Sequence, residues 1–370
     1  MIKRFTLMLV SAALMLAAVP LLAQVEDSDL VYDPSVCAGS AFLAQPTPTC
    51  MAMMEAFPAP DFEPIPQDRA TLSQYSFWRV GPEAVPTFDA PGGNQIGEIA
   101  AGFNFVNAVD TSVDGWLQIE GGEWIPRDRA SFTEPSYFSG VMFPEDGWEY
   151  EFAWVLDLSY TYVSERPGGE PSEATGRFLE RYEVIHIFDT AVDSEGWRWY
   201  MIGPNQWVKQ TFVSKFQPMD ADDMPEDVSK KWVAVDLYEQ TLIAYEGETP
   251  VFATVIATGI PPTETNEGLF EVWASLARDG MSGATGAPNA YALQSVPWVL
   301  YFDDDISLHG TYWHDLFGYR QSRGCVNLTI SDARQVFEWM ADSEPNADGE
   351  IVNSVYVHST GVYGENVIRG

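Results

Sequence analysis

The stretch Ser307-Leu-His-Gly-Thr-Tyr-Trp-His-Asp-Leu-Phe-Gly-Tyr-Arg-Gln-Ser-Arg-Gly-Cys-Val-Asn-Leu328 carries the strongest signal in the sequence. Within it, His309 and Cys325 each stand next to a glycine. A thiol attacks as its thiolate, so a nucleophilic cysteine needs a lowered pKa or a neighbouring base. The number of residues between His309 and Cys325 is too large for one face of a helix, but it suits the facing ends of two strands joined by a loop. We therefore expect Cys325 to be a nucleophile and His309 its base.

The two glycines fit the same chemistry. Gly310 and Gly324 let the backbone approach a peptide substrate closely, and Gly324 tolerates a strained turn. The N–H groups of Gly324 and Cys325 are candidates for stabilising a developing oxyanion.

Three alternatives stay open at this point. A lone cysteine is often buried and inert, which is the plainest interpretation of Cys325. His314 lies in an aromatic loop and is a second candidate base. A zinc site made of His309, His314 and Cys325 is disfavoured, because the paired spacing of zinc ligands is absent.

Short apolar runs separated by turn residues predict a β-rich domain over residues 228–360. Strands are expected at 232–237, 241–245, 251–257, 269–273, 298–301 and 352–358. A helix is expected at 332–340, where the apolar residues follow the spacing of one helical face. Ser331 is the expected N-cap.

The order H-G-T, a spacer, then S-x-G-C-V-N ahead of a capped helix resembles the catalytic signature of the L,D-transpeptidase family. The runs Lys231-Trp-Val-Ala-Val-Asp-Leu237 and Gln240-Thr-Leu-Ile-Ala-Tyr-Glu246 look like that family's opening strands. The resemblance covers residues 230–358, about a third of the chain. It implies a mainly β fold with a short helix after the nucleophile.

The resemblance also implies roles for individual residues. Cys325 matches the catalytic cysteine and His309 the catalytic histidine. The backbone carbonyl of Gly310 is implied to orient the imidazole. Ser322 and Asn327 occupy motif positions that line the family's active site.

Arg323 departs from the family pattern, which usually has a histidine directly before Gly-Cys. An arginine here is expected to stabilise the thiolate or to meet a substrate carboxylate. The alternative is a solvated surface arginine. The candidate oxyanion and substrate-binding residues are therefore Gly324, Ser322, Arg323, Asn327 and Gly310.

For activity, the resemblance implies acyl transfer on peptidoglycan stem peptides, without a cofactor or metal. Cys325 would attack the third residue of the stem and expel the terminal D-alanine. An amine of a neighbouring stem would then resolve the thioester as a 3→3 cross-link. β-Lactams of the carbapenem type are the implied covalent inhibitors. The alternatives are an L,D-carboxypeptidase, in which water resolves the thioester, and a non-catalytic wall-binding protein.

Two weak repeats precede this domain, at residues 71–139 and 140–220. The first contains VPTFDAPGG, DGW and EWIP, and the second contains YVSERPGG, EGW and QWVK, in matching order. Their short alternating runs predict two small antiparallel barrels. They resemble bacterial SH3-like domains. Binding to the wall and simple spacing are both open roles for them.

The N-terminus predicts export. Two basic residues precede an apolar run, and residues 1–23 are expected to form a cleaved signal peptide, with a retained membrane anchor as the alternative. Residues 24–70 are rich in proline and predict a tail or linker. In an oxidising compartment Cys37 and Cys50 are expected to form a disulfide, which leaves Cys325 free.

The net charge of the chain limits the classes of molecule that it can bind. The net charge of −35 over 370 residues excludes nucleic acid and anionic lipid as partners. Together with the signal peptide it predicts an exported protein of the cell wall, periplasm or extracellular space. His186 is expected to be structural, and His358 has no assigned role. The tyrosines Tyr291, Tyr301 and Tyr312 are candidates for a cleft wall or for core.

Overall fold

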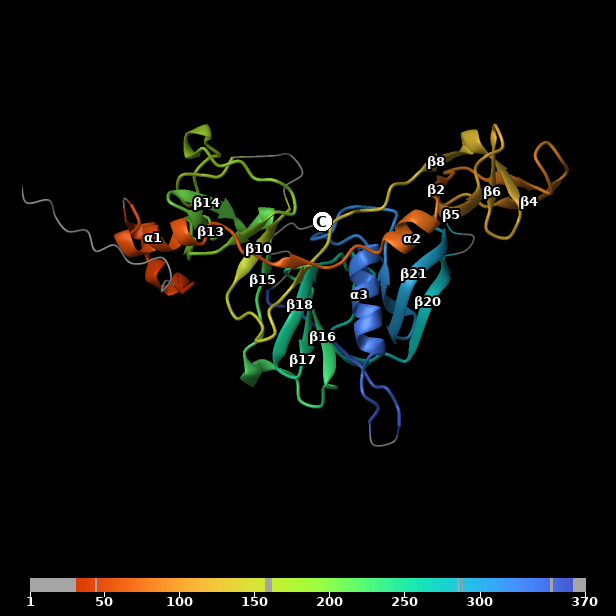
Figure 1. Ribbon diagram of the computed structural model, residues 1–370. Coiled ribbons are helices and arrows are strands. Elements are labelled where there is room, and N and C mark those ends of the chain that lie inside the picture. Colours follow the sequence, from red (N-terminus) through yellow and green to blue (C-terminus); the bar gives the residue numbers. More distant parts are fainter. Residues whose placement is uncertain are drawn as a thin grey trace, which may run out of the picture.

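The computed structural model describes residues 31–43, 45–156, 162–284, 287, 289–346 and 349–361 (Figure 1). The fold is mainly β, as predicted, and has three parts. A C-terminal unit, residues 228–361, lies between two small β modules, which stand at its two upper corners in Figure 1. The predicted signal peptide, residues 1–23, lies outside the described residues. No helix in the described ranges is long and apolar enough to cross a membrane.

One face of the C-terminal unit is a seven-stranded sheet, in the order β1-β9-β18-β17-β16-β24-β19. Its strands are β16 (Lys231–Asp236), β17 (Thr241–Glu246), β18 (Thr249–Val255), β19 (Gly268–Glu271) and β24 (Ser354–His358), with the short strands β1 (Glu63–Pro64) and β9 (Val141–Met142) at one side. The strands predicted in this region are present. The two short strands come from segments far earlier in the chain, which alternation alone could not reveal.

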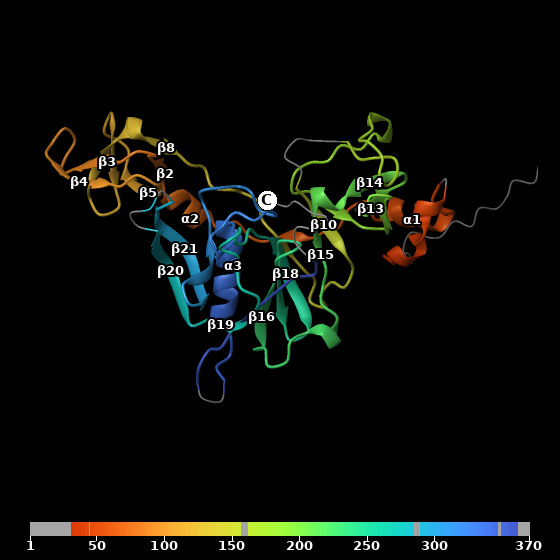
Figure 2. The ribbon, with the colours of Figure 1, turned by 180° about the vertical axis from the view of Figure 1, so that it is seen from behind.

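A second sheet faces the first. It contains β20 (Ala274–Gly283), β21 (Tyr291–Asp303), β22 (Ile306–Gly310) and β23 (Val326–Leu328). The helix α3 (Ile330–Ala341) lies between the two sheets, as both views show (Figure 1, Figure 2). Its buried residues Ala333, Val336 and Met340 join a core that includes residues of both sheets. The predicted helix is therefore present and faces the core as expected.

The N-cap of α3 differs from the prediction. Thr329 is the cap, because its side chain accepts a hydrogen bond from the Asp332 amide at 3.1 Å. Ser331 lies one step inside the first turn, and its hydroxyl instead accepts from the Asp68 amide at 3.0 Å. Serine and threonine are both common N-cap residues, so the sequence alone does not decide between them. In the structure the Ser331 hydroxyl is engaged by the Asp68 amide, and Thr329 is the cap.

The first β module, residues 77–132, lies inside the predicted repeat 71–139. Its elements are β2 (Phe77–Val80), β3 (Val85–Phe88), β4 (Gln95–Ile99), β5 (Phe103–Asp110), β6 (Trp116–Ile119), β7 (Trp124–Pro126), the 3-10 turn η3 (Arg127–Arg129) and β8 (Ala130–Phe132). The last strand returns to pair with the first. The module also continues the second sheet, because β5 pairs in parallel with β21. The short helix α2 (Arg69–Gln74) leads into it.

The second β module, residues 152–216, repeats part of this plan. Its elements are β10 (Phe152–Val155), η4 (Glu173–Thr175), β11 (Val184–His186), β12 (Asp189–Val192), β13 (Arg198–Gly203), β14 (Gln206–Lys209), η5 (Gln210–Phe212) and β15 (Val213–Phe216). A 3-10 turn again precedes a last strand that pairs with the first. The two modules share the pairing of first and last strands, but β3 and β4 have no counterpart among the strands of the second module. The likeness of the modules to SH3 domains stays a prediction.

The second module also shares a core with the C-terminal unit. Phe152, Trp154 and Phe216 pack in one cluster with Trp232 and Tyr245 of the seven-stranded sheet. The turn η6 (Ala221–Asp223) connects the two parts. Neither module is therefore a detached spacer.

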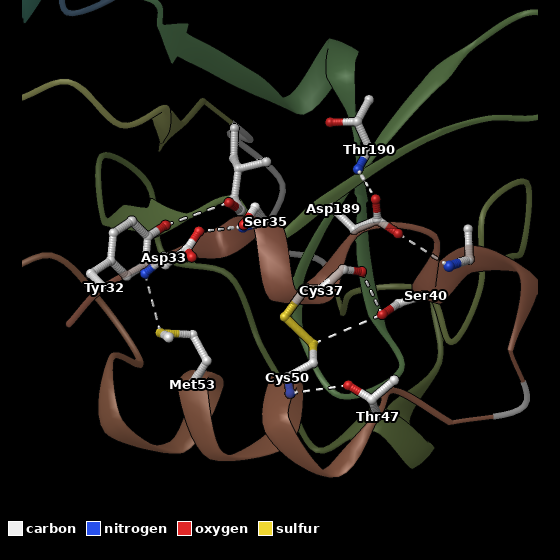
Figure 3. Close-up of a disulfide and its surroundings, with 12 residues drawn as sticks. Tyr32, Asp33, Ser35, Cys37, Ser40, Thr47, Cys50, Met53, Asp189 and Thr190 are labelled. Atoms are coloured by element: carbon white, nitrogen blue, oxygen red, sulfur yellow. Dashed lines mark hydrogen bonds between the residues drawn. A yellow bond between two sulfur atoms is a disulfide. The ribbon is translucent and has the colours of Figure 1, made fainter. Parts of the chain in front are cut away.

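Residues 31–70 correct the expectation of a free tail or linker. The turns η1 (Pro34–Cys37) and η2 (Ser40–Phe42) and the helix α1 (Pro48–Ala56) pack on the second module. Cys37 and Cys50 form the predicted disulfide, shown in Figure 3, and both are buried. The chain then crosses the C-terminal unit, where Ile65 enters the main core. Its prolines suit these caps and extended runs as well as they suit a linker.

Candidate active site

His309 and Cys325 come together on two neighbouring strands. β22 and β23 pair in parallel, with His309 opposite Asn327 and Leu308 opposite Val326. Cys325 directly precedes β23, and its Sγ lies 3.7 Å from the Ser307 hydroxyl of β22. Side chains alternate along a strand, so Ser307 and His309 share one face with Cys325 and Asn327. The two residues thus lie on adjacent parallel strands, near the C-terminal end of β22 and directly before the N-terminal end of β23, and not at facing strand ends as predicted.

Both residues line one cavity of about 340 Å³. Among the other residues of its wall are Ile260, Met281, Leu293, Trp313, His314, Gln321, Ser322, Arg323 and Asn327, with Phe103 and Tyr291 on one side. Phe103 belongs to β5 of the first module, and no signal in the sequence connects it with the catalytic motif. Tyr291 does line the cleft, whereas Tyr312 is fully buried.

His309 is buried, and its surroundings fix its tautomer. Its Nδ1 lies 3.2 Å from the Gly310 carbonyl, which can only accept, so Nδ1 carries the proton. Nε2 then holds the free lone pair. Burial lowers the pKa of His309 to about 4, although the Gly310 carbonyl opposes this shift. The imidazole is therefore neutral near pH 7 and able to accept a proton. The orienting role expected of Gly310 matches this contact.

Cys325 is half-buried and is the free cysteine of the described residues. Burial raises the pKa of its thiol, while hydrogen bonds from Ser307 lower it and the charge of Asp305 raises it. Cys325 and His309 therefore rest as a neutral thiol and a neutral imidazole. Such a pair makes its thiolate at the moment of attack, by general-base transfer to the histidine.

The turn before the nucleophile requires glycine. Gly324 has φ of +121°, and a Cβ at this position would lie 3.3 Å from Ile306 Cδ1. Its amide donates to the Ser322 hydroxyl at 3.2 Å, and that hydroxyl donates to the Cys325 carbonyl. The Gly324 N–H is thus engaged, which corrects its predicted role as an oxyanion donor. Ser322 holds the nucleophile turn in place.

Asn327 and His314 form a second pair in the wall. The His314 Nδ1 accepts from the Leu316 amide at 3.1 Å, so a neutral His314 carries its proton on Nε2. That nitrogen lies 2.8 Å from the Asn327 Nδ2, while the Asn327 Oδ1 has no hydrogen-bond partner. Because two N–H groups cannot bond to each other, we assign the Asn327 amide the flipped orientation, in which its oxygen accepts from His314. Both ring nitrogens of His314 are then engaged, which disfavours it as the base.

The Arg323 side chain contacts Tyr291 and the Asn289 main chain. Its guanidinium lies 5.0 Å from the ring centroid of Tyr291 and donates to the Asn289 carbonyl. It is exposed at the rim of the cavity. Contact with a substrate carboxylate fits this position, and stabilisation of the thiolate stays a prediction.

Both β modules hold the loop between His309 and Cys325. From the first module, the Phe77 ring stacks on Tyr312 with 3.8 Å between centroids. From the second, Arg181 forms an ion pair of 2.9 Å with Asp315. The Tyr319 hydroxyl donates at 3.1 Å to the carbonyl of Leu156, which directly follows β10.

The other histidines lie elsewhere. His186 is buried in the second module, where its ring stacks on Tyr32 at 4.2 Å. His358 stacks on Tyr356 in β24 and does not line the cavity. Within the described ranges, no group of three His, Cys, Asp or Glu side chains is placed to hold a metal ion.

Residues 230–357 match the YkuD family, whose description is the L,D-transpeptidase catalytic domain. The C-terminal third of the chain is therefore an L,D-transpeptidase catalytic domain, as the sequence motif predicted.

Solved structures give further likenesses. An L,D-transpeptidase from Stackebrandtia nassauensis is 25% identical, over 39% of this chain and 63% of that one, with a TM-score of 0.28. A mutant L,D-transpeptidase from Enterococcus faecium is 23% identical, over 39% and 55%, with a TM-score of 0.31. L,D-transpeptidase 3 from Mycobacterium tuberculosis, in complex with a faropenem-derived adduct, is 16% identical, over 44% and 77%, with a TM-score of 0.31. The match thus spans less than two thirds of the first two proteins. No curated protein matches the chain.

Proposed function

We propose that the protein is a peptidoglycan L,D-transpeptidase that forms 3→3 cross-links through a thioester on Cys325. The observation that supports this most strongly is the neutral pair of Cys325 and His309 on one cavity wall, within a domain of that family. We also propose that the protein is exported and acts at the cell wall. Its acidic net charge and its disulfide, which persists in oxidising compartments, support this proposal.

In the first step His309 Nε2 takes the thiol proton as Sγ bonds to the carbonyl carbon of the third stem residue. The bond from that carbon to the terminal D-alanine nitrogen then breaks, and His309 returns the proton to the leaving amine. In the second step the amine of another stem attacks the thioester. The new amide forms, the bond between carbon and sulfur breaks, and the amine proton passes through His309 to Sγ.

Water in place of the amine would make the protein an L,D-carboxypeptidase. The cavity wall carries no carboxylate among the described residues to activate a water, and His309 serves either acceptor equally well. The match to the L,D-transpeptidase catalytic domain makes transpeptidation the first choice.

Muropeptide analysis of purified wall fragments incubated with the protein tests the proposal. Wild-type protein should produce dimers joined between two third residues, and Cys325→Ala should produce none while its thermal unfolding stays unchanged. Trimmed monomers without dimers would assign the carboxypeptidase instead. Dimers formed by Cys325→Ala above background would refute the thioester mechanism.

A further inference from the structure

A second groove of about 750 Å³ lies between the first β module and the hairpin of β20 and β21. Its wall includes Arg79, Ala101, Phe103, Asn104, Ser282 and Tyr291. Phe103 and Tyr291 also line the active-site cavity, so the two spaces adjoin along these residues.

Hydrogen bonds of the main chain fix this groove. β5 and β21 pair in parallel, with Phe103 opposite Tyr291 and Asn104 opposite Ala292. The Phe103 amide also donates to the Ala290 carbonyl at 2.9 Å. A shared sheet resists relative movement of its strands, so the first module forms a permanent part of the wall.

The charge of the two spaces differs from that of the chain. Their described walls contain no Asp or Glu, although the chain has 54 such residues. Their cationic side chains are Arg79, at the groove, and Arg323, at the rim of the cavity. By contrast, the pocket of the second module is lined by Glu170, Asp193 and Glu195. Compared with the pocket of the second module, the groove and the active-site cavity suit an anionic ligand better.

We propose that this groove binds the part of the donor stem peptide that lies upstream of the acylated residue, with carboxylates facing Arg79 and Arg323. The inference rests on the proposed function and names the site that positions its substrate. A cavity of about 340 Å³ is at the small end of the range for ligand sites, ~300–1,000 Å³, so a stem attached to glycan extends beyond it.

The donor is favoured over the acceptor because its upstream part stays bound through both steps. The acceptor enters only after D-alanine leaves. A groove that directly adjoins the nucleophile cavity, and is built on a rigid sheet, suits the partner that must hold the acyl carbon against Cys325.

The test compares acylation of Cys325 by two reagents, using intact mass over time. A stem tetrapeptide needs the groove, and a carbapenem needs only the cavity. Arg79→Ala should lower kcat/KM for the tetrapeptide by up to about fivefold, the scale of an exposed ion pair, and Arg79→Lys should restore part of it. Ala101→Trp, which fills the groove from an exposed position, should lower it by about tenfold or more. Acylation by the carbapenem should not change.

Arg127→Ala is the matched control. Arg127 lies on the same module and covers the Trp78 ring at 5.0 Å, but it lines neither space. It should leave both reactions unchanged.

Each other outcome would overturn the proposal in a recognisable way. Unchanged acylation by both reagents in Ala101→Trp would show that the groove is not used. Unchanged acylation with slower transfer to an amine would assign the groove to the acceptor. Equal slowing with the carbapenem would indicate a distorted nucleophile. A wild-type protein that reacts with the carbapenem but not with the tetrapeptide would refute the proposed function itself.

Discussion

The ring of Phe77 stacks face to face on the ring of Tyr312, with 3.8 Å between centroids and 8° between planes. Phe77 opens the first β module, and Tyr312 lies three residues after His309. Both rings are fully buried, in a cluster that also contains Trp313 of the cavity wall. The first module is thus part of the support for the catalytic loop.

Phe77→Ala should therefore lower acylation of Cys325 by a carbapenem by about tenfold, because the loop that carries Trp313 loses its support. It should also cost ~3 kcal/mol or more of unfolding free energy, as for other buried phenylalanines. Phe88→Ala is the control, since Phe88 contacts Trp116 within the module. Equal acylation rates in the two variants would argue against a supporting role of Phe77.

His309→Ala should lower the acylation rate by ~10²-fold or more, the usual scale for a positioned base. His314→Ala should have a far smaller effect, because hydrogen bonds from Leu316 and with Asn327 engage both of its ring nitrogens. Time courses of acylation for the two variants give the comparison. A slower reaction in His314→Ala than in His309→Ala would transfer the role of base to His314.

The pH dependence of acylation should reflect the buried His309, whose pKa is lowered to about 4. Protonation removes the base, so the rate should fall with acid around pH 4 and stay level from about pH 5 to 8. The raised pKa of the Cys325 thiol keeps the resting state neutral over this range. Second-order rates with a carbapenem measure this profile. A midpoint near the ordinary value of His, ~6.5, would contradict it.

Asp332, at the start of α3, should make the protein less stable as pH rises from about 4 to 6. Burial raises the pKa of its carboxyl from 3.8 to about 6, although Thr254 and Gly140 donate to it. In this window the folded state holds a proton that the unfolded state has lost, so stability falls by roughly 3 kcal/mol at most.

Asp332→Asn removes this titration and can keep both contacts. Denaturant unfolding at pH 4 and pH 7 measures the effect. The unfolding free energy of the variant relative to that of wild type should be higher at pH 7 than at pH 4. If this difference is the same at both pH values, Asp332 does not titrate between them.

Removal of the disulfide should affect stability but not acylation. The double variant Cys37→Ala and Cys50→Ala should lose ~3 kcal/mol, the scale for a loop of this length. The bridge lies on the second module, far in sequence from Cys325. Unfolding and carbapenem acylation are the two measurements. Native wild-type protein should show one reactive thiol, and a count of three would mean that the bridge is absent.

The pattern around Cys325 and His309 predicted much of the site, because its spacing and its glycines are local features. It also predicted the mainly β fold and the helix after the nucleophile. It did not predict that the Gly324 amide binds Ser322 or that Asn327 accepts from His314. Those contacts depend on which side chains lie next to each other in the folded protein. The alternation of apolar and polar residues along a strand does not predict such neighbours.

By itself the sequence predicted the class of catalytic domain and the disulfide, and it supplied Cys325 and His309 as the proposed nucleophile and base. Only the tertiary structure decided what the two β modules do for the site. The apolar face of a short strand predicts that this face is buried, but it does not predict which other element covers it. Here the faces of both modules are buried against the C-terminal unit, so Phe103 lines the active-site cavity and Phe77 supports its loop.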